Sequence, residues 1–135
     1  ARARAPADAW VAGEDSGIEA AALDGQPGVQ SARWAADGIS ELLAALARET
    51  DRRVRYVCEL VAISPAGEEF RGTGALDGVV ADASRGTGGF GYDPIVVPLG
   101  ETRTVAELGA TWKAVHSHRA LAARALAAAL QEDGA

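Results

Sequence analysis

The first candidate for chemistry is the stretch GTGGFGYDP at residues 86–94, which contains the G-x-G-x-x-G string of a dinucleotide-binding loop. Such a loop must open a helix whose N-terminal N–H groups face the pyrophosphate. Pro94 instead biases Asp93 away from the helical region, and the strand formers Ile-Val-Val follow. We therefore expect no helix to open here, which excludes a dinucleotide loop. A Walker A loop is excluded as well, because no Gly-Lys-Ser or Gly-Lys-Thr follows.

The same stretch carries two aromatic side chains and one carboxylate, at Phe90, Tyr92 and Asp93. In an extended backbone Phe90 and Tyr92 would share a face and could stack on a planar base. The Asp93 carboxylate could accept hydrogen bonds from the N–H groups of such a base. The alternative is a tight turn whose aromatic side chains belong to the core, and the spacing alone favours that alternative.

Two adjacent carboxylates, Glu14 and Asp15, precede Ser16 and Gly17. On a strand these two side chains would lie on opposite faces, so we expect only Asp15 to act in a site. A carboxylate there could hold a divalent cation or act as a general base for the attack of water on a phosphate. In isolation the residues also fit an Asx-type turn before Gly17.

Basic side chains gather near the C-terminal helix, where His116 and His118 form a His-x-His pattern followed by Arg119. At the start of a helix the two imidazoles point apart, and no third ligand is evident, so we do not expect a metal there. Arg119 lies at the head of the predicted helix, where backbone N–H groups also favour an anion. The alternative is a solvated helix start with no ligand.

Strands and turns are predicted to carry these groups. A short apolar approach at residues 10–12 leads to the two carboxylates and a brief strand around Ile18, and DGQPG is a turn. Residues 53–64 alternate at first and then become apolar on both faces, which is typical of a central strand. Residues 69–81 return as an antiparallel strand, in which Gly72 and Gly74 indicate a bulge or a close backbone approach. Residues 94–98, PIVVP, form a last short strand.

Three helices are predicted from apolar periodicity and capping residues. Residues 38–50 place Ile39, Leu42, Leu43 and Leu46 on one stripe. Thr104 and Glu107 fit a capping box that starts a short helix. Residues 117–132 form the last helix, with Ser117 as N-cap and a stripe of Leu121, Ala125, Leu126 and Leu130. The order of elements therefore indicates an α/β or α+β fold with an antiparallel component, in one domain over residues 1–135.

Composition limits the class of protein. The 135 residues suit one domain, and the net charge of −6 without a basic stripe argues against nucleic acid as a partner. An acidic protein can still bind phosphates when a divalent cation bridges them to its carboxylates. The single cysteine, Cys58, excludes an intramolecular disulfide and a cysteine metal site. Without a signal peptide or an apolar run of membrane-spanning length in these residues, we expect a cytoplasmic protein and no membrane partner.

Three blocks in this order resemble the inosine triphosphate pyrophosphatase family, whose bacterial members act on XTP and dITP. The blocks are DSGIEAAALDGQPGVQSARWA, GTGGFGYDPIVVP and TVAELGATWKAVHSHRALAARAL, and the resemblance spans roughly residues 9 to 130. It implies Mg²⁺-dependent hydrolysis of ITP, dITP and XTP to the monophosphate and pyrophosphate. It also implies a two-lobed α/β fold around an elongated sheet that is mixed, largely antiparallel and flanked by helices. The nucleotide would lie in the cleft, and the protein would usually be a homodimer.

The resemblance assigns roles to individual residues. Asp15 matches the catalytic carboxylate, which also holds the metal, and Ser16 follows it in the substrate site, whereas Glu14 stands where many members have another Asp. The remaining substrate-binding residues are on the base side of the pocket: Phe90, Gly91, Tyr92, Asp93, Lys113, His118 and Arg119.

Lys113 and Arg119 would explain how a deaminated base is selected. Both side chains only donate hydrogen bonds, so they can pair with the carbonyl at C6 of hypoxanthine or xanthine. The amino group of adenine would find no acceptor there, and a site that leaves buried polar groups unpaired rejects the wrong substrate strongly. Guanine also has a C6 carbonyl, so excluding GTP requires a second feature.

The family's T-x-N-x-x-K motif, which grips the triphosphate, is absent from these residues, and residues 1–5 resemble the end of the helix that follows a metal-binding Glu. We therefore expect the domain to be N-terminally incomplete and a chain of these 135 residues alone to be nearly inactive. The alternative function is a non-catalytic module that binds purine nucleotides.

Overall fold

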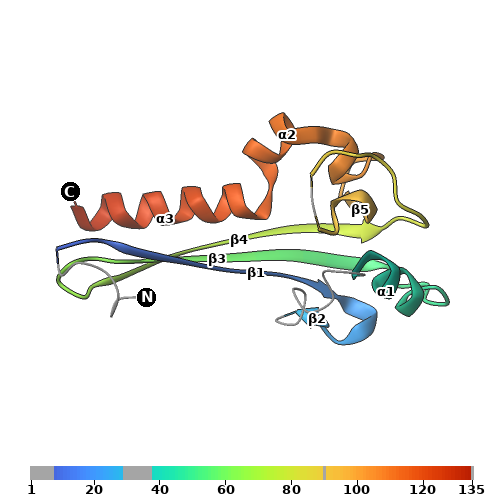
Figure 1. Cartoon of the computed structure of the whole chain (residues 1–135), viewed down its shortest axis with the longest axis horizontal. Helices are drawn as coiled ribbons and strands as arrows, with labels where there is room; N and C mark the ends of the chain where they lie inside the picture. Colours follow the sequence, from blue (N-terminus) through green and yellow to red (C-terminus); the bar gives the residue numbers. More distant parts are fainter. Residues whose placement is uncertain (1–7, 29–37, 90, 135) are drawn as a thin grey trace.

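The molecule is built on one elongated antiparallel sheet with helices packed on one side (Figure 1). This computed structural model describes residues 8–28, 38–89 and 91–134. In this part of the chain the strand order is β2-β1-β3-β4-β5. The strands are β1 (Val11–Ala20), β2 (Pro27–Gly28), β3 (Arg53–Ile63), β4 (Glu69–Val80) and β5 (Val96–Pro98). The helices are α1 (Gly38–Ala45), α2 (Val105–His116) and α3 (His118–Gly134), with 3₁₀ turns η2 (Ala21–Leu23) and η3 (Asp93–Ile95).

Strand β3 is the centre of the sheet, as predicted. It pairs antiparallel with β1 from Val54 to Ile63 and with β4 over its whole length. Every strand pair in the described ranges is antiparallel, which confirms the largely antiparallel sheet. Strand β1 is longer than expected, because the polar residues Glu14, Asp15 and Ser16 continue it without a turn. The Asx turn considered before Gly17 is therefore absent.

The two faces of the sheet differ in character. The inner face carries Tyr56 and Cys58 of β3 and lies against the helices. The outer face carries Arg55, which forms an ion pair with Asp77, and Glu59, which forms one with Arg71. These ion pairs are exposed, so the outer face is polar while the inner face holds the core.

Helix α3 lies along the inner face of β4 and β3, where glycines allow its backbone to come close. A Cβ atom at Gly74 would lie 2.1 Å from the carbonyl oxygen of His118, and one at Gly72 would lie 2.3 Å from that of Ala122. The close approach predicted for these glycines is confirmed. The predicted stripe on α3 is wrong at Ala125, which is exposed, whereas Ala122 is fully buried. The glycines of β4 face the backbone of Ala122 together with the Cβ atoms of Leu121 and Leu126, and the exposed Ala125 is not part of this contact.

The other half of the inner face holds the main hydrophobic core. Leu42 and Leu46 of the segment around α1 are fully buried, which confirms the predicted stripe. They lie in one cluster with residues of β1, η3, β5 and α2: Ile18, Ile95, Val96 and Val105. The chain passes from α2 to α3 between this core and the half that α3 covers (Figure 1).

The loop before β5 differs from the extended backbone that was expected. Gly91 has a φ of 60° and Tyr92 has φ −86° and ψ 1°, so the backbone turns at these two residues and is not extended there. Tyr92 is buried in the main core, as in the alternative interpretation, and Phe90 lies outside the described residues. A short 3₁₀ turn opens at Asp93, although no helix was expected; it is too short for a dinucleotide loop.

Candidate functional site

A buried polar network lies where the centre of β3 meets η3 and α2. The hydroxyl of Tyr56 donates to Oδ1 of Asp93 at 2.9 Å, and Nζ of Lys113 donates to Oδ2 of the same carboxylate at 2.6 Å. Asp93 is only 4% exposed, and the side chain of Lys113 is 20% exposed. A buried carboxylate needs such partners, because an unpaired charge in the interior is very costly. Tyr56 thus holds the Asp93 carboxylate, and that carboxylate in turn holds the ammonium of Lys113.

The glycine-rich loop lets Asp93 occupy this position. Gly89 has a φ of 76°, and a Cβ atom there would lie 2.3 Å from Oδ2 of Asp93. No other residue fits there without moving the carboxylate, because Gly alone combines this backbone conformation with the required space. Gly89 therefore serves close packing around Asp93, whereas Gly86 and Gly88 lie close to Ala106 and Glu107 at the start of α2.

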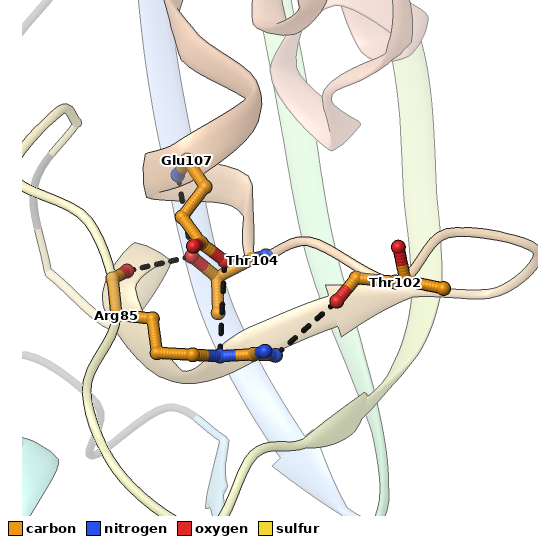
Figure 2. A network of polar contacts seen from close by, with 4 residues as sticks. All are labelled: Arg85, Thr102, Thr104 and Glu107. Carbon is orange, nitrogen blue, oxygen red and sulfur yellow. Dashed lines mark hydrogen bonds and ion pairs between the residues drawn. The ribbon is translucent and has the colours of Figure 1, made fainter.

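The start of the loop is anchored on the N-terminus of α2 (Figure 2). The Thr104 hydroxyl donates to the carbonyl of Arg85 at 2.7 Å, and the Arg85 guanidinium donates to the Thr102 carbonyl and forms an ion pair with Glu107. Thr104 and Glu107 also form the predicted capping box of α2. At the other end, the amide of Arg85 donates to the carbonyl of Pro94. Loop and helix are therefore one unit, which carries both Asp93 and Lys113.

His118 lies on the other side of Tyr56. The two rings stack with centroids 4.5 Å apart and an interplanar angle of 7°. Burial, with the nearby charge of Arg119, lowers the pKa of His118 to about 4, so the imidazole is neutral at pH 7. Its Nδ1 is buried and has no hydrogen-bond partner within the described ranges. A neutral imidazole beside the Lys113 network can donate or accept a hydrogen bond.

Arg119 reaches across the sheet to β1. Its Nε and Nη2 donate to Oε1 of Glu14, at 2.9 and 2.5 Å, and the hydroxyl of Ser16 donates to the same oxygen at 2.8 Å. Partial burial opposes ionisation of Glu14, but the hydrogen bonds from Ser16 and Arg119 outweigh it and lower its pKa. Glu14 thus connects two residues predicted to touch substrate, Ser16 and Arg119.

Asp15 lies on the outer face of the sheet. Strand alternation separates it from Glu14, and the register pairs it with Glu59 of β3. Its side chain is exposed, and it makes no hydrogen bond within the described residues. No cluster of three or more His, Cys, Asp or Glu side chains that could hold a metal occurs in that part of the chain.

The predicted site residues thus separate into groups. The inner face brings together Ser16, Asp93, Lys113, His118 and Arg119, whereas Asp15 lies on the outer face, Gly91 lies in open space and Tyr92 is in the core. His116 is exposed and contacts the ring of Trp112, so it does not join His118 in a metal site. Sequence reasoning missed Tyr56 and the part played by Glu14. A tyrosine on the buried face of a central strand was a usable signal, because its hydroxyl must find a partner.

Comparison with known proteins gives consistent matches. A model of the Ham1 family matches residues 1–129. A dITP/XTP pyrophosphatase of Bdellovibrio bacteriovorus is 39% identical over 130 residues, which cover 90% of this chain and 65% of the relative. A dITP/XTP pyrophosphatase of Symbiobacterium thermophilum is 48% identical over 124 residues, covering 87% and 61%. The chain therefore spans less than two thirds of the length of these curated relatives.

Solved structures agree on the fold. The Ham1 protein of Staphylococcus aureus superimposes with a TM-score of 0.86 at 37% identity, covering 93% of this chain and 69% of that one. A HAM1 protein of Coxiella burnetii gives a TM-score of 0.83 at 34% identity, covering 91% and 68%. Separately, no helix in the described ranges is both long and apolar enough to cross a membrane.

Proposed function

Because the chain belongs to the Ham1 family, we propose that the protein hydrolyses the purine nucleoside triphosphates ITP, dITP and XTP to the monophosphate and pyrophosphate. The names of the relatives, dITP/XTP pyrophosphatases, support this substrate class. The observation that carries the proposal is the ammonium of Lys113, held by the buried carboxylate of Asp93 beside His118 and Arg119. By hydrolysing these nucleotides, the protein would keep the cellular nucleotide pool free of deaminated purines.

Base selection follows from the hydrogen-bonding character of this group. Lys113 and Arg119 present only donors, which match the C6 carbonyl of hypoxanthine and xanthine. Adenine would place an amino donor against them, and the unpaired buried groups would cost binding. Since Asp93 already accepts from Tyr56 and Lys113, its main contribution is to orient Lys113; a direct contact with the base edge would use its remaining lone pairs.

The phosphate end is assigned to Asp15 and Ser16, with Mg²⁺ as the cofactor. Their side chains lie on opposite faces of β1, which at these residues is the edge of the described sheet, so the substrate would reach both around that edge. Mg²⁺ in such enzymes is bound by one or two carboxylates together with substrate phosphates and water. Asp15 fits as such a ligand, because its carboxylate is exposed and makes no hydrogen bond within the described residues. When bound, Mg²⁺ offsets phosphate charge and lowers the pKa of coordinated water. Asp15 would bind that ion or accept the proton of the attacking water.

Two further features of the proposal concern the whole protein. The family resemblance supports a homodimer, which light scattering of the purified protein would test. It also supports a cytoplasmic location, where nucleotide pools reside, and cell fractionation would test that.

The decisive experiment measures pyrophosphate release from ITP, XTP, GTP and ATP with Mg²⁺ and with excess chelator. It uses the longest available chain that contains these residues. We expect turnover of ITP and XTP only with Mg²⁺, and at least about 100-fold lower kcat/KM for ATP, because a mispaired buried group costs several orders of magnitude. Equal turnover of ATP and ITP would contradict the proposal.

A further inference from the structure

Tyr56 is the point at which three separate segments of the candidate site meet. Its hydroxyl donates to Asp93 of η3, and through that carboxylate it holds Lys113 of α2. Its ring stacks on His118, the first residue of α3. These three residues, Asp93, Lys113 and His118, were all predicted to bind the base. Tyr56 thus contacts Asp93 and His118 directly and is linked to Lys113 through the Asp93 carboxylate.

The strand that carries Tyr56 is the most constrained element of the sheet. Tyr56 pairs with Ile18 of β1 on one side and with Leu76 of β4 on the other, and it is 7% exposed. Loops and the ends of helices, in contrast, make fewer hydrogen bonds to neighbouring elements, so their structure opens locally more easily. A side chain on β3 can therefore serve as a fixed reference for groups on η3, α2 and α3.

We propose that Tyr56 is a positioning residue for base recognition: its hydroxyl orients Asp93 and thereby the ammonium of Lys113, while its ring orients His118. This inference rests on the proposed function, because it assigns Tyr56 a part in selecting the base at that same site. It adds a residue that touches no substrate and acts through the residues that do.

The chemistry of the hydroxyl suits this task. Burial, together with the negative charge of Asp93, raises the pKa of Tyr56 well above its usual value, so the phenol stays protonated and remains a donor. Without that donor, Oδ1 of Asp93 would be left buried without this partner, and the carboxylate could rotate about its χ2 toward other donors. Lys113 would then lose its fixed direction, because its 2.6 Å contact is to the same carboxylate.

Tyr56→Phe tests the inference, since it removes the hydroxyl and keeps the ring that stacks on His118. We expect kcat/KM for ITP to fall about tenfold, mainly through KM, which is the size of one buried hydrogen bond to a charged group. Turnover of ATP should change little, so the preference for ITP over ATP should also fall about tenfold. Val54→Ala is the matched control, because it removes core packing from the same strand and face without a polar contact. It should retain the ITP/ATP preference even if it lowers stability.

A second readout does not depend on turnover. Lys113 is the only lysine in these 135 residues, and its ammonium, which is paired with Asp93 and mostly shielded from water, should give a slowly exchanging NH₃⁺ signal in ¹⁵N NMR. The signal is assigned by its loss in Lys113→Arg. We expect Tyr56→Phe to broaden or shift it, and Val54→Ala to leave it in place. In the wild-type protein, the Tyr56 hydroxyl proton should itself appear as a slowly exchanging resonance.

The outcomes separate this inference from the proposed function. If the wild-type protein does not distinguish ITP from ATP, the proposed function fails, whatever the NMR shows. If it does distinguish them and Tyr56→Phe keeps both the preference and the ammonium signal, the role of Tyr56 is overturned. Should Tyr56→Phe fail to fold, the wild-type hydroxyl resonance decides, and its absence overturns the role.

Discussion

Glu14 and Asp15 are consecutive residues of β1 whose carboxylates lie on opposite faces of the sheet. Glu14 accepts hydrogen bonds from Arg119 on the inner face, whereas Asp15 lies opposite Glu59 on the outer face. Two neighbouring acidic residues therefore have different surroundings, and substitutions that remove one charge at a time can separate their roles.

Asp15→Asn is expected to lower kcat for ITP by at least about 100-fold, the usual contribution of a general base or metal-binding carboxylate. Stability should be unchanged, because the side chain is exposed. Glu14→Gln is the matched comparison: it loosens Arg119 and should raise KM several-fold with kcat largely retained. Steady-state kinetics with ITP measures both, and wild-type activity in Asp15→Asn would refute the catalytic assignment.

Asp93→Asn is expected to destabilise the protein by about 3 kcal/mol, because it leaves the Lys113 charge without its buried partner. Asp77→Asn provides the control, since it breaks an exposed ion pair with Arg55 and should cost less than about 1 kcal/mol. Urea unfolding followed by circular dichroism gives both free energies. Equal effects of the two substitutions would show that the Asp93 network contributes no more than a surface pair.

Gly74→Ala is expected to destabilise the protein by about 1–3 kcal/mol or more, because the added methyl group would meet the backbone of α3. Gly13→Ala is a matched control in the same sheet, as a Cβ atom there would meet nothing within 4 Å. Thermal unfolding compares the two. A tolerated Gly74→Ala would mean that α3 does not lie this close to β4.

The free energy of unfolding should depend on pH through His118. Its pKa is about 4 in the folded protein and near 6.5 in the unfolded chain, so the unfolded chain binds more protons between these values. Stability therefore falls as pH drops from about 6.5 toward 4, by less than about 1.4 kcal/mol per pH unit, because the ring is partly exposed.

His118→Phe, which keeps an aromatic ring beside Tyr56, should flatten this slope when urea unfolding is measured between pH 5 and 7. The lowered pKa of Glu14 affects stability only below about pH 4.5, so it does not contribute to the slope between pH 5 and 7. His116→Phe serves as the control and should keep the slope, because it leaves His118 in place. An unchanged slope in His118→Phe would assign the effect to another group.

Several local patterns were predicted correctly from the sequence, although the α3 stripe at Ala125 and the extended backbone at Tyr92 were not. The capping box of Thr104 and Glu107, the buried leucines of α1 and the close approach at Gly74 are all present. The capping box and the leucine stripe depend on residues within a turn or two of one another, and the close approach at Gly74 depends on a missing side chain. Such features can be recognised directly in the sequence. The family resemblance likewise came from ordered blocks of residues that need no coordinates.

The site itself depended on contacts between distant residues. Tyr56 and Asp93 are 37 positions apart, and Glu14 and Arg119 are 105 apart. No periodicity links such pairs, because their meeting depends on how β3, the glycine loop and the α2–α3 turn pack. The sequence alone therefore identified the residue types, the family and the individual elements. Only the tertiary structure showed that Asp93 is bound by Tyr56 and Lys113, since a buried carboxylate takes the partners that packing brings to it.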